Sequence, residues 1–194
     1  MGNVSPCGKL PVTFPKRLED TPCFHNFPGE NDKVTYGEGI YLGYRHYDSA
    51  KVEPLFPFGY GLSYTTFSYS NMRISKDTLM SDSGKIDVLI DITNTGSVPG
   101  KESVQFYVAQ TSKPGLARPV KELKGFDKVG LKPGETKTAR CVLDKYALGY
   151  YDDKKARWVV DQDAEFKVIA GASSRDLKGE KEFKVAGGPW GWIF

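Results

Sequence analysis

The fold is decided by residues 85–110, which read KIDVLIDITNTGSVPGKESVQFYVAQ. Apolar and polar side chains alternate over residues 85–93 and again over residues 102–110, and the breaker NTGSVPG separates the two runs. Alternation predicts a half-buried β-strand, because successive side chains of a strand point to opposite faces. Val104, Phe106 and Val108 therefore share one face, which we expect to lie in a core.

Similar short segments follow one another from Thr65 to Val185. They predict further strands over residues 67–74, 121–131, 136–143, 157–160, 165–171 and 181–185, with turn-forming residues between them. Seven or eight short strands at near-regular spacing, without a helix of note, are typical of an all-β, antiparallel β-sandwich. We assign Trp158 and Phe166, together with Phe106, to its core.

The N-terminal part has a different composition. Residues 1–60 hold seven of the twelve prolines and show no helical periodicity, so we expect a mostly coil extension. The segment Tyr36–Tyr69 is rich in tyrosine, phenylalanine and glycine. We expect a coil whose rings fix it to a folded body, because glycine permits sharp turns and aromatic rings bury large areas.

Several strings resemble glycoside hydrolase family 3, the β-glucosidase family. They are EGIYLGYRHYD (38–48), PLFPFGYGLSYTTF (54–67), NTGSVPGKESVQFYV (94–108), RPVKELKGFDKVGLKPGET (118–136) and WVVDQDAEFKVIAGASSRD (158–176), while GKLPVTFPKRLEDTP (8–22) resembles the last strand of the family's α/β sandwich domain and the loop after it. The resemblance implies that residues 1–62 are the end of that domain and its linker. It also implies that residues 63–186 form an immunoglobulin/fibronectin type III-like domain, and that residues 187–194 are a tail.

The same resemblance implies that this chain is inactive alone. Family members that hydrolyse β-glucosides use an Asp nucleophile in an N-terminal barrel and a Glu acid/base in the α/β sandwich domain. Both positions precede the equivalent of Gly8, so we assign no catalytic residue. The carboxylates of Glu38, Asp48 and Glu53 are expected on solvated loops, and Asp152 and Asp153 at a turn.

Metal, cofactor, nucleic-acid and membrane-spanning functions find no support. His25 and His46 lie 21 residues apart, and no His-x₃-His or Cys-x-x-Cys spacing occurs, so no metal site or cofactor is expected. A net charge of +3 without a basic stripe argues against nucleic acid. No apolar run approaches the roughly 18 residues that span a bilayer.

Binding is the remaining class of activity. Sugar rings stack on aromatic side chains, and the resulting candidates for contact with a carbohydrate or another partner are Tyr41, Tyr44, Tyr47, Tyr60 and Tyr64. The alternative is that these rings pack the extension onto the sandwich or onto a neighbouring domain.

Cys7 and Cys23 stand where the family is expected to have small residues, and we expect a disulfide between them. Asn3 begins the sequon Asn3-Val4-Ser5, a candidate glycosylation site. Trp190 and Trp192 lie in the string GGPWGWIF, for which the family offers no counterpart. We expect them to be the freest indoles of the chain, in a frayed or non-native tail; the alternative is that they anchor a partner or a membrane surface.

Three functions remain open. The first is a non-catalytic C-terminal fragment of a β-glucosidase-like hydrolase, which acts as a structural and carbohydrate-contacting module. The second is a stand-alone lectin-like or protein-binding protein of the immunomodulatory type, and the third is an excerpt of an active β-glucosidase. The partners considered are a polysaccharide, a second copy of the chain, or the missing catalytic domains. Members of the family are often secreted, but this N-terminus does not predict a signal peptide, so localisation stays open.

Overall fold

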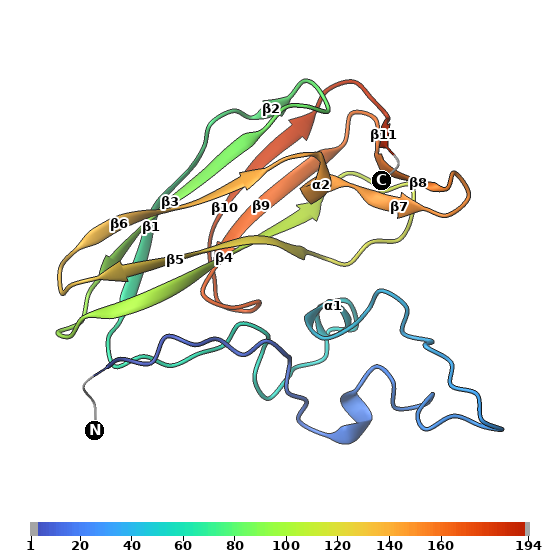
Figure 1. Ribbon diagram of the computed structural model, residues 1–194, viewed down its shortest axis with the longest axis horizontal. Helices are drawn as coiled ribbons and strands as arrows, with labels where there is room; N and C mark the ends of the chain where they lie inside the picture. Colours follow the sequence, from blue (N-terminus) through green and yellow to red (C-terminus); the bar gives the residue numbers. More distant parts are fainter. Residues whose placement is uncertain (1–3, 193–194) are drawn as a thin grey trace.

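Two β-sheets pack face to face in the computed structural model, which describes residues 4–192 (Figure 1). The first sheet has the order β1-β3-β6 and consists of β1 (Phe67–Ile74), β3 (Ile86–Asn94) and β6 (Thr136–Leu143). The second has the order β2-β10-β9-β4-β5 and consists of β2 (Thr78–Leu79), β10 (Leu177–Val185), β9 (Glu165–Gly171), β4 (Gly100–Gln110) and β5 (Glu122–Leu131). All pairs are antiparallel except the short contact of β2 with β10. The predicted antiparallel sandwich is confirmed.

The core lies between the inward faces of the two sheets. Along β3, buried and half-buried residues alternate from Ile86 to Asn94, as the sequence pattern predicts. Phe106 on β4 is fully buried and Phe166 on β9 is 1% exposed, and the ring of Phe166 stacks on that of Phe183 at 5.5 Å. These two core assignments are confirmed.

A third, small sheet closes one end of the sandwich. It has the order β11-β8-β7 and consists of β11 (Trp190–Trp192), β8 (Arg157–Val160) and β7 (Tyr150–Asp152). The expectation that Trp190 and Trp192 are free is wrong, because both lie in β11, are half-buried and pack against the core.

Trp158 is the core assignment that the structure corrects. It lies in the small sheet, only half-buried, where its ring stacks on Trp192 at 6.4 Å and meets the edge of Tyr151 at 5.9 Å. Trp192 and Tyr151 are its partners on the two neighbouring strands, so the three rings share one face of this sheet. An alternating pattern in a short strand predicts which side chains share a face. It does not predict whether that face packs in the main core or in a smaller sheet.

Three short helical segments interrupt the coil and the loops: η1 (Leu18–Asp20), α1 (Tyr44–Ser49) and α2 (Lys145–Leu148). The extension is mostly coil, as expected, but α1 was not predicted. Six residues are too few to show a helical period or to form a helix without tertiary contacts. Gly43, at φ 51°, provides the left-handed residue before α1.

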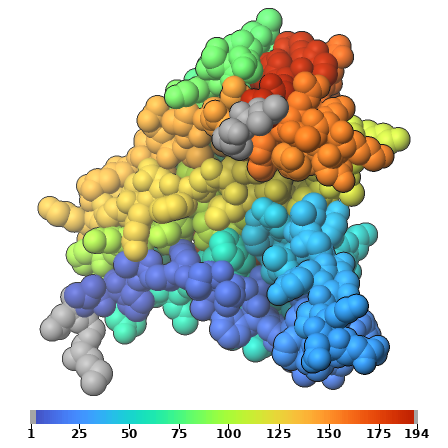
Figure 2. Space-filling model, turned by 45° about the vertical axis from the view of Figure 1, so that its right-hand side comes forward, coloured from blue at the N-terminus to red at the C-terminus, as the bar shows by residue number. Residues whose placement is uncertain are grey.

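The extension doubles back on itself before it enters β1. Backbone hydrogen bonds join Leu10 N–H to the Tyr60 carbonyl at 2.8 Å and Phe14 N–H to the Phe56 carbonyl at 2.9 Å. The paired stretches lie beneath the sandwich, next to β4 and β5 (Figure 2). Within residues 4–192, no helix is long and apolar enough to cross a membrane.

We expect Phe106→Ala to lower the free energy of unfolding by about 3–5 kcal/mol, because it leaves a cavity in a closed core. Trp158→Ala should lower it by clearly less, since this half-buried ring lies outside that core. Phe126→Ala is the matched control. That ring is 73% exposed, and its loss should change stability by less than about 0.5 kcal/mol. Urea unfolding of the three variants measures these values. Equal losses for Trp158→Ala and Phe106→Ala would contradict the assignment.

Candidate functional site

Part of the outer face of the second sheet is buried, although a two-layer sandwich would leave it in water. Gln105 and Tyr107 of β4 are 4% and 0% exposed, yet they point away from the core that holds Phe106. Ile169 of β9, the ladder partner of Tyr107, is 6% exposed on the same outer face. The extension covers this face, and the contact between extension and sandwich is the candidate site.

An aromatic group joins the two parts. The Tyr44 ring lies 5.1 Å from that of Phe58 and meets the Tyr107 ring edge-on at 5.7 Å. The Tyr44 hydroxyl accepts a hydrogen bond of 2.7 Å from the backbone N–H of Leu123. Burial raises the pKa of Tyr107, so its hydroxyl stays protonated and acts as a donor.

Gln105 connects the sheet to the extension by hydrogen bonds. Its Nε2 donates to the carbonyls of Gly59 at 3.1 Å and Ala172 at 3.0 Å, and its Oε1 accepts from the Tyr107 hydroxyl at 2.5 Å. Gly59 has φ 80°, and a Cβ at this position would collide with the Gln105 amide. Only glycine therefore allows this close approach.

A buried ionic cluster fixes α1 to the sandwich. Asp48 of α1 accepts from Lys121 Nζ at one carboxylate oxygen and from Arg175 Nε at the other, at 2.7 Å. The side chains of Asp48 and Lys121 are each 7% exposed. Arg175 also donates to the carbonyls of Tyr47 at 3.2 Å and Val52 at 3.1 Å. We call Asp48, Lys121 and Arg175 the docking cluster.

A second charged group lies beside it. Glu122 is within 2.7 Å of Arg118, 3.2 Å of Arg45 and 3.7 Å of Lys124. Burial opposes ionisation of Glu122, but these cations hold its pKa below the ordinary value. Burial also lowers the pKa of Lys124, against the opposing effect of Glu122. Arg45 belongs to α1, so this group is a second link between the extension and the sandwich.

The five candidate tyrosines do not share one surface. Tyr47 is 2% exposed, and burial raises its pKa; Tyr44 is half-buried in the aromatic group described above. Tyr41 and Tyr60 are half-buried, and the Tyr60 ring lies 5.3 Å from that of Phe56. Tyr64 is 63% exposed and is the candidate most open to a ligand.

The expected disulfide is not formed. Cys7 and Cys23 are free thiols, half-buried and exposed respectively. Between them, the chain runs alongside residues 56–60, and this carries Cys23 away from Cys7. Asn3 lies outside the described residues. Among residues 4–192, no group of three His, Cys, Asp or Glu side chains is arranged to hold a metal.

The docking cluster was missed because no local pattern marks it. Asp48 was expected on a solvated loop, which is wrong, since it lies on α1 and its side chain is buried. The same expectation suits Glu53, whose side chain is 67% exposed beside Arg175. Lys121 lies 73 positions from Asp48 in the chain, so only the tertiary fold brings the charges together.

The extension also carries most of the exposed large apolar side chains among the described residues. Tyr36 is 80% exposed, Phe27 73%, Leu62 71% and Leu18 70%. These four exposed residues of the extension are what we call its apolar face. Exposure of so many large apolar side chains in one segment is unusual for a surface that faces only water.

Comparison with known proteins places both parts of the chain. A family model described as glycosyl hydrolase family 3 C-terminal domain matches residues 1–44, and one described as fibronectin type III-like domain matches residues 102–174. The thermostable β-glucosidase B of Acetivibrio thermocellus is 48% identical over 95% of this chain and 24% of its own length. A β-glucosidase of Bacteroides ovatus is 46% identical over 94% of this chain and 25% of its own.

Solved structures agree. The family 3 β-glucosidase of Bifidobacterium adolescentis superposes with a TM-score of 0.88 at 41% identity, covering 96% of this chain and 27% of that one. The β-glucosidase of Kluyveromyces marxianus, solved in complex with glucose, gives a TM-score of 0.87 at 42% identity, with 98% and 22% covered. The chain thus spans about a quarter of the length of the relatives that it matches.

Asp48→Ala should lower the free energy of unfolding by about 3–5 kcal/mol, because it leaves the buried ammonium of Lys121 without a counter-charge. Glu53→Ala removes an exposed partner of Arg175 and should cost less than about 1 kcal/mol. Urea unfolding compares the two variants. In the double variant Asp48→Leu/Lys121→Met we expect part of the loss to be recovered. A double variant less stable than Asp48→Ala would contradict the role of the pair.

Proposed function

The chain belongs to glycosyl hydrolase family 3, of whose members it carries a C-terminal part, and from this premise we propose that it is a non-catalytic structural module. In this proposal, the sandwich is a rigid base on which the extension is held in shape. The apolar face of the extension then docks against the remaining domains of a β-glucosidase-like enzyme.

Two observations together support this proposal: one side of the extension is fixed to the sandwich, and the apolar face of the extension is exposed to water. Tyr44, Asp48 and Gly59 fix the inner side of the extension to the sheet. The rings and aliphatic chains of the outer side point to water instead. Apolar area is worth about 25 cal/mol per Å² when it is removed from water, so such a face favours a partner surface.

The chemistry of the chain supports a non-catalytic role. Retaining hydrolysis needs two carboxyl groups about 5–5.5 Å apart, one ionised and one held protonated. Both oxygens of Asp48 are engaged by cations, and Glu102 accepts from Lys9 at 2.9 Å and from the Tyr69 hydroxyl at 2.6 Å. Neither buried carboxylate is placed as a nucleophile or a proton donor.

A second candidate function is direct carbohydrate contact, as a lectin-like module. The observation in its favour is Tyr64, whose exposed ring lies at the start of the sandwich.

We propose the boundaries 1–62, 63–186 and 187–194 as the division between extension, sandwich domain and tail. Activity as part of a complete β-glucosidase remains the third reading.

The first test is complementation. The chain alone should not hydrolyse an aryl β-glucoside or cellobiose. Mixed or co-expressed with a truncated A. thermocellus β-glucosidase B that lacks the matching C-terminal part, it should form a complex and restore turnover. Phe27→Ser/Leu62→Ser in the apolar face should weaken the complex at least tenfold, whereas Phe126→Ser on the sandwich should not. Restoration that is indifferent to the apolar face would refute the docking role, and turnover by the purified chain alone would refute the non-catalytic role.

The second test is self-association of the chain without its partner. The average mass in sedimentation equilibrium should rise with concentration, because the apolar face can be covered by a second copy. Phe27→Ser/Leu62→Ser should remain monomeric, with Phe126→Ser again as the control. Point variants are preferable to removal of residues 1–62, which would uncover Tyr107 and Ile169 and create a new apolar surface. Monomeric behaviour of the unmodified chain at high concentration would contradict this expectation.

A further inference from the structure

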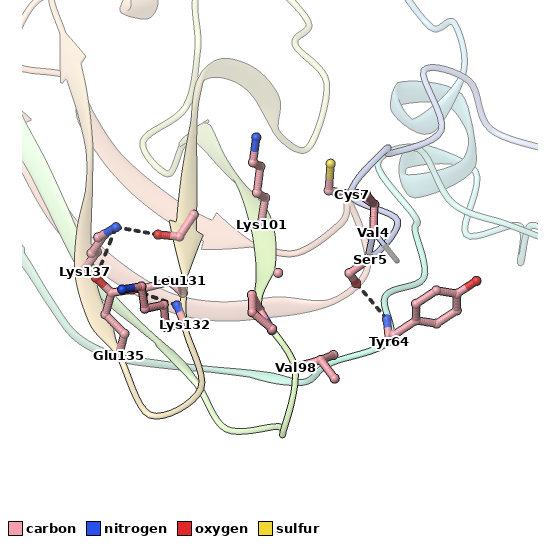
Figure 3. Close-up of a pocket in the computed structure, with 13 residues that line it drawn as sticks. Val4, Ser5, Cys7, Tyr64, Val98, Lys101, Leu131, Lys132, Glu135 and Lys137 are labelled. Atoms are coloured by element: carbon pink, nitrogen blue, oxygen red, sulfur yellow. Dashed lines mark hydrogen bonds and ion pairs between the residues drawn. The ribbon is translucent and has the colours of Figure 1, made fainter. Parts of the chain in front are cut away.

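A groove lies on the side of the sandwich where the extension enters it. It is a cavity of about 620 Å³, with Val4, Ser5, Cys7 and Tyr64 on one side and the turn between β5 and β6 on the other (Figure 3). The start of β4, from Gly100 to Lys101, lies between the two sides. Its volume is in the range of small-ligand sites. None of the functions considered above uses this groove as a whole.

The charge of the groove is unbalanced. Its lining includes three lysines and one carboxylate, Glu135. Glu135 is already engaged, since it lies 3.2 Å from Lys137 Nζ and accepts the backbone N–H of Lys132 at 2.7 Å. The side chains of Lys101 and Lys132 form no ion pair within residues 4–192, and both residues are exposed. The groove therefore attracts anions.

The nearest buried carboxylate does not neutralise these two lysines. Glu102 follows Lys101 in β4, but its side chain is 7% exposed and bonded to Lys9 and to the Tyr69 hydroxyl. Lys101 instead passes over Gly130, where a Cβ would lie 3.6 Å from the lysine stem. In Figure 3 the Lys101 side chain points away from Glu135.

The rest of the lining is apolar. Val98 is 38% exposed, Leu131 is buried beneath the groove, and the Tyr64 ring forms the outer end. In Figure 3 this ring points away from Lys132 and Lys137, so ring and ammonium groups would contact different units of a ligand.

We propose that this groove binds an acidic oligosaccharide, with uronate carboxylates at Lys101 and Lys132 and the C–H face of a neighbouring sugar unit on Tyr64 and Val98. The lining favours a sugar chain, because the exposed Tyr64 ring offers a stacking surface for a C–H face and the lysines offer partners for carboxylates; an acidic peptide is the alternative that the experiment tests. In Figure 3 Lys101 lies between Lys132 and Tyr64, so a linear ligand that crosses the groove would pass the two lysines before it reaches the ring. The inference names the ligand class for the carbohydrate-contacting function, and it is independent of docking through the apolar face.

The experiment titrates the full chain with a tetrasaccharide of 1,4-linked galacturonate and, separately, with neutral cellotetraose. Binding is measured by titration calorimetry and by NMR chemical-shift changes. We expect the uronate to bind at least tenfold more tightly and its affinity to fall as salt is added. Lys101→Glu/Lys132→Glu should weaken uronate binding at least tenfold, and Tyr64→Ala severalfold. The matched control is Lys85→Glu/Lys154→Glu, which changes the net charge equally at exposed positions outside the groove and should retain binding.

Several outcomes of these titrations would overturn the proposal. They are no uronate binding at millimolar concentration, equal binding of cellotetraose, and equal loss in the control, which would indicate general charge attraction. Tighter binding of an acidic peptide of the same charge, tested in parallel, would also overturn it. Far-ultraviolet circular dichroism confirms that each variant is folded. The Phe27→Ser/Leu62→Ser variant distinguishes this proposal from the docking proposal. If it loses complementation but still binds the uronate, the two functions depend on different surfaces and can fail separately.

Discussion

The paired charges of Asp48, Lys121 and Arg175 are the constraint on which the arrangement of extension and sandwich depends. A lysine and an aspartate that are each 7% exposed are tolerated only as partners, because an isolated buried charge costs several kcal/mol. Such a pair adds little net stability compared with apolar residues. It does discriminate strongly among positions, since a shift of α1 would leave both charges unpaired. The aromatic contacts bury apolar surface between the extension and the sheet. The docking cluster selects the one position of the extension in which this surface is buried.

This placement gives the part of the second sheet around Tyr107 and Ile169 two buried faces. The inner face belongs to the sandwich core around Phe106, and the outer face, with Tyr107, belongs to the contact with the extension. The chain is therefore a three-layer body in which the third layer has little regular secondary structure. The solved β-glucosidases of Bifidobacterium adolescentis and Kluyveromyces marxianus superpose on 96% and 98% of this chain, extension included, so this layer is not a local irregularity of one chain.

The sandwich could be read from the sequence because its information is local. Alternation over residues 85–93 and 102–110 predicted β3 and β4 to within two residues at each end. The contact layer could not be read in this way. Gln105 and Tyr107 follow the pattern of solvent-facing residues, and their burial comes from contacts with the extension and with distant loops of the sandwich. Trp158 follows the pattern of a core residue but lies in a separate small sheet, whose edge strand β11 carries no strand signal of its own. The aromatic segment indicated that a contact exists, but its ionic partners are distant in the chain.

The distance between Asp48 and Arg175 has a consequence for biosynthesis. The two residues are 127 positions apart in the chain (175 − 48). A ribosome adds about 5–20 residues per second. The extension thus leaves the ribosome roughly 6–25 s before its last anchoring cation exists. During this interval the second sheet is incomplete, and Arg175 is not available to bind Asp48. The docking surface of the extension is therefore complete only after β9 and the loop that follows it have been synthesised.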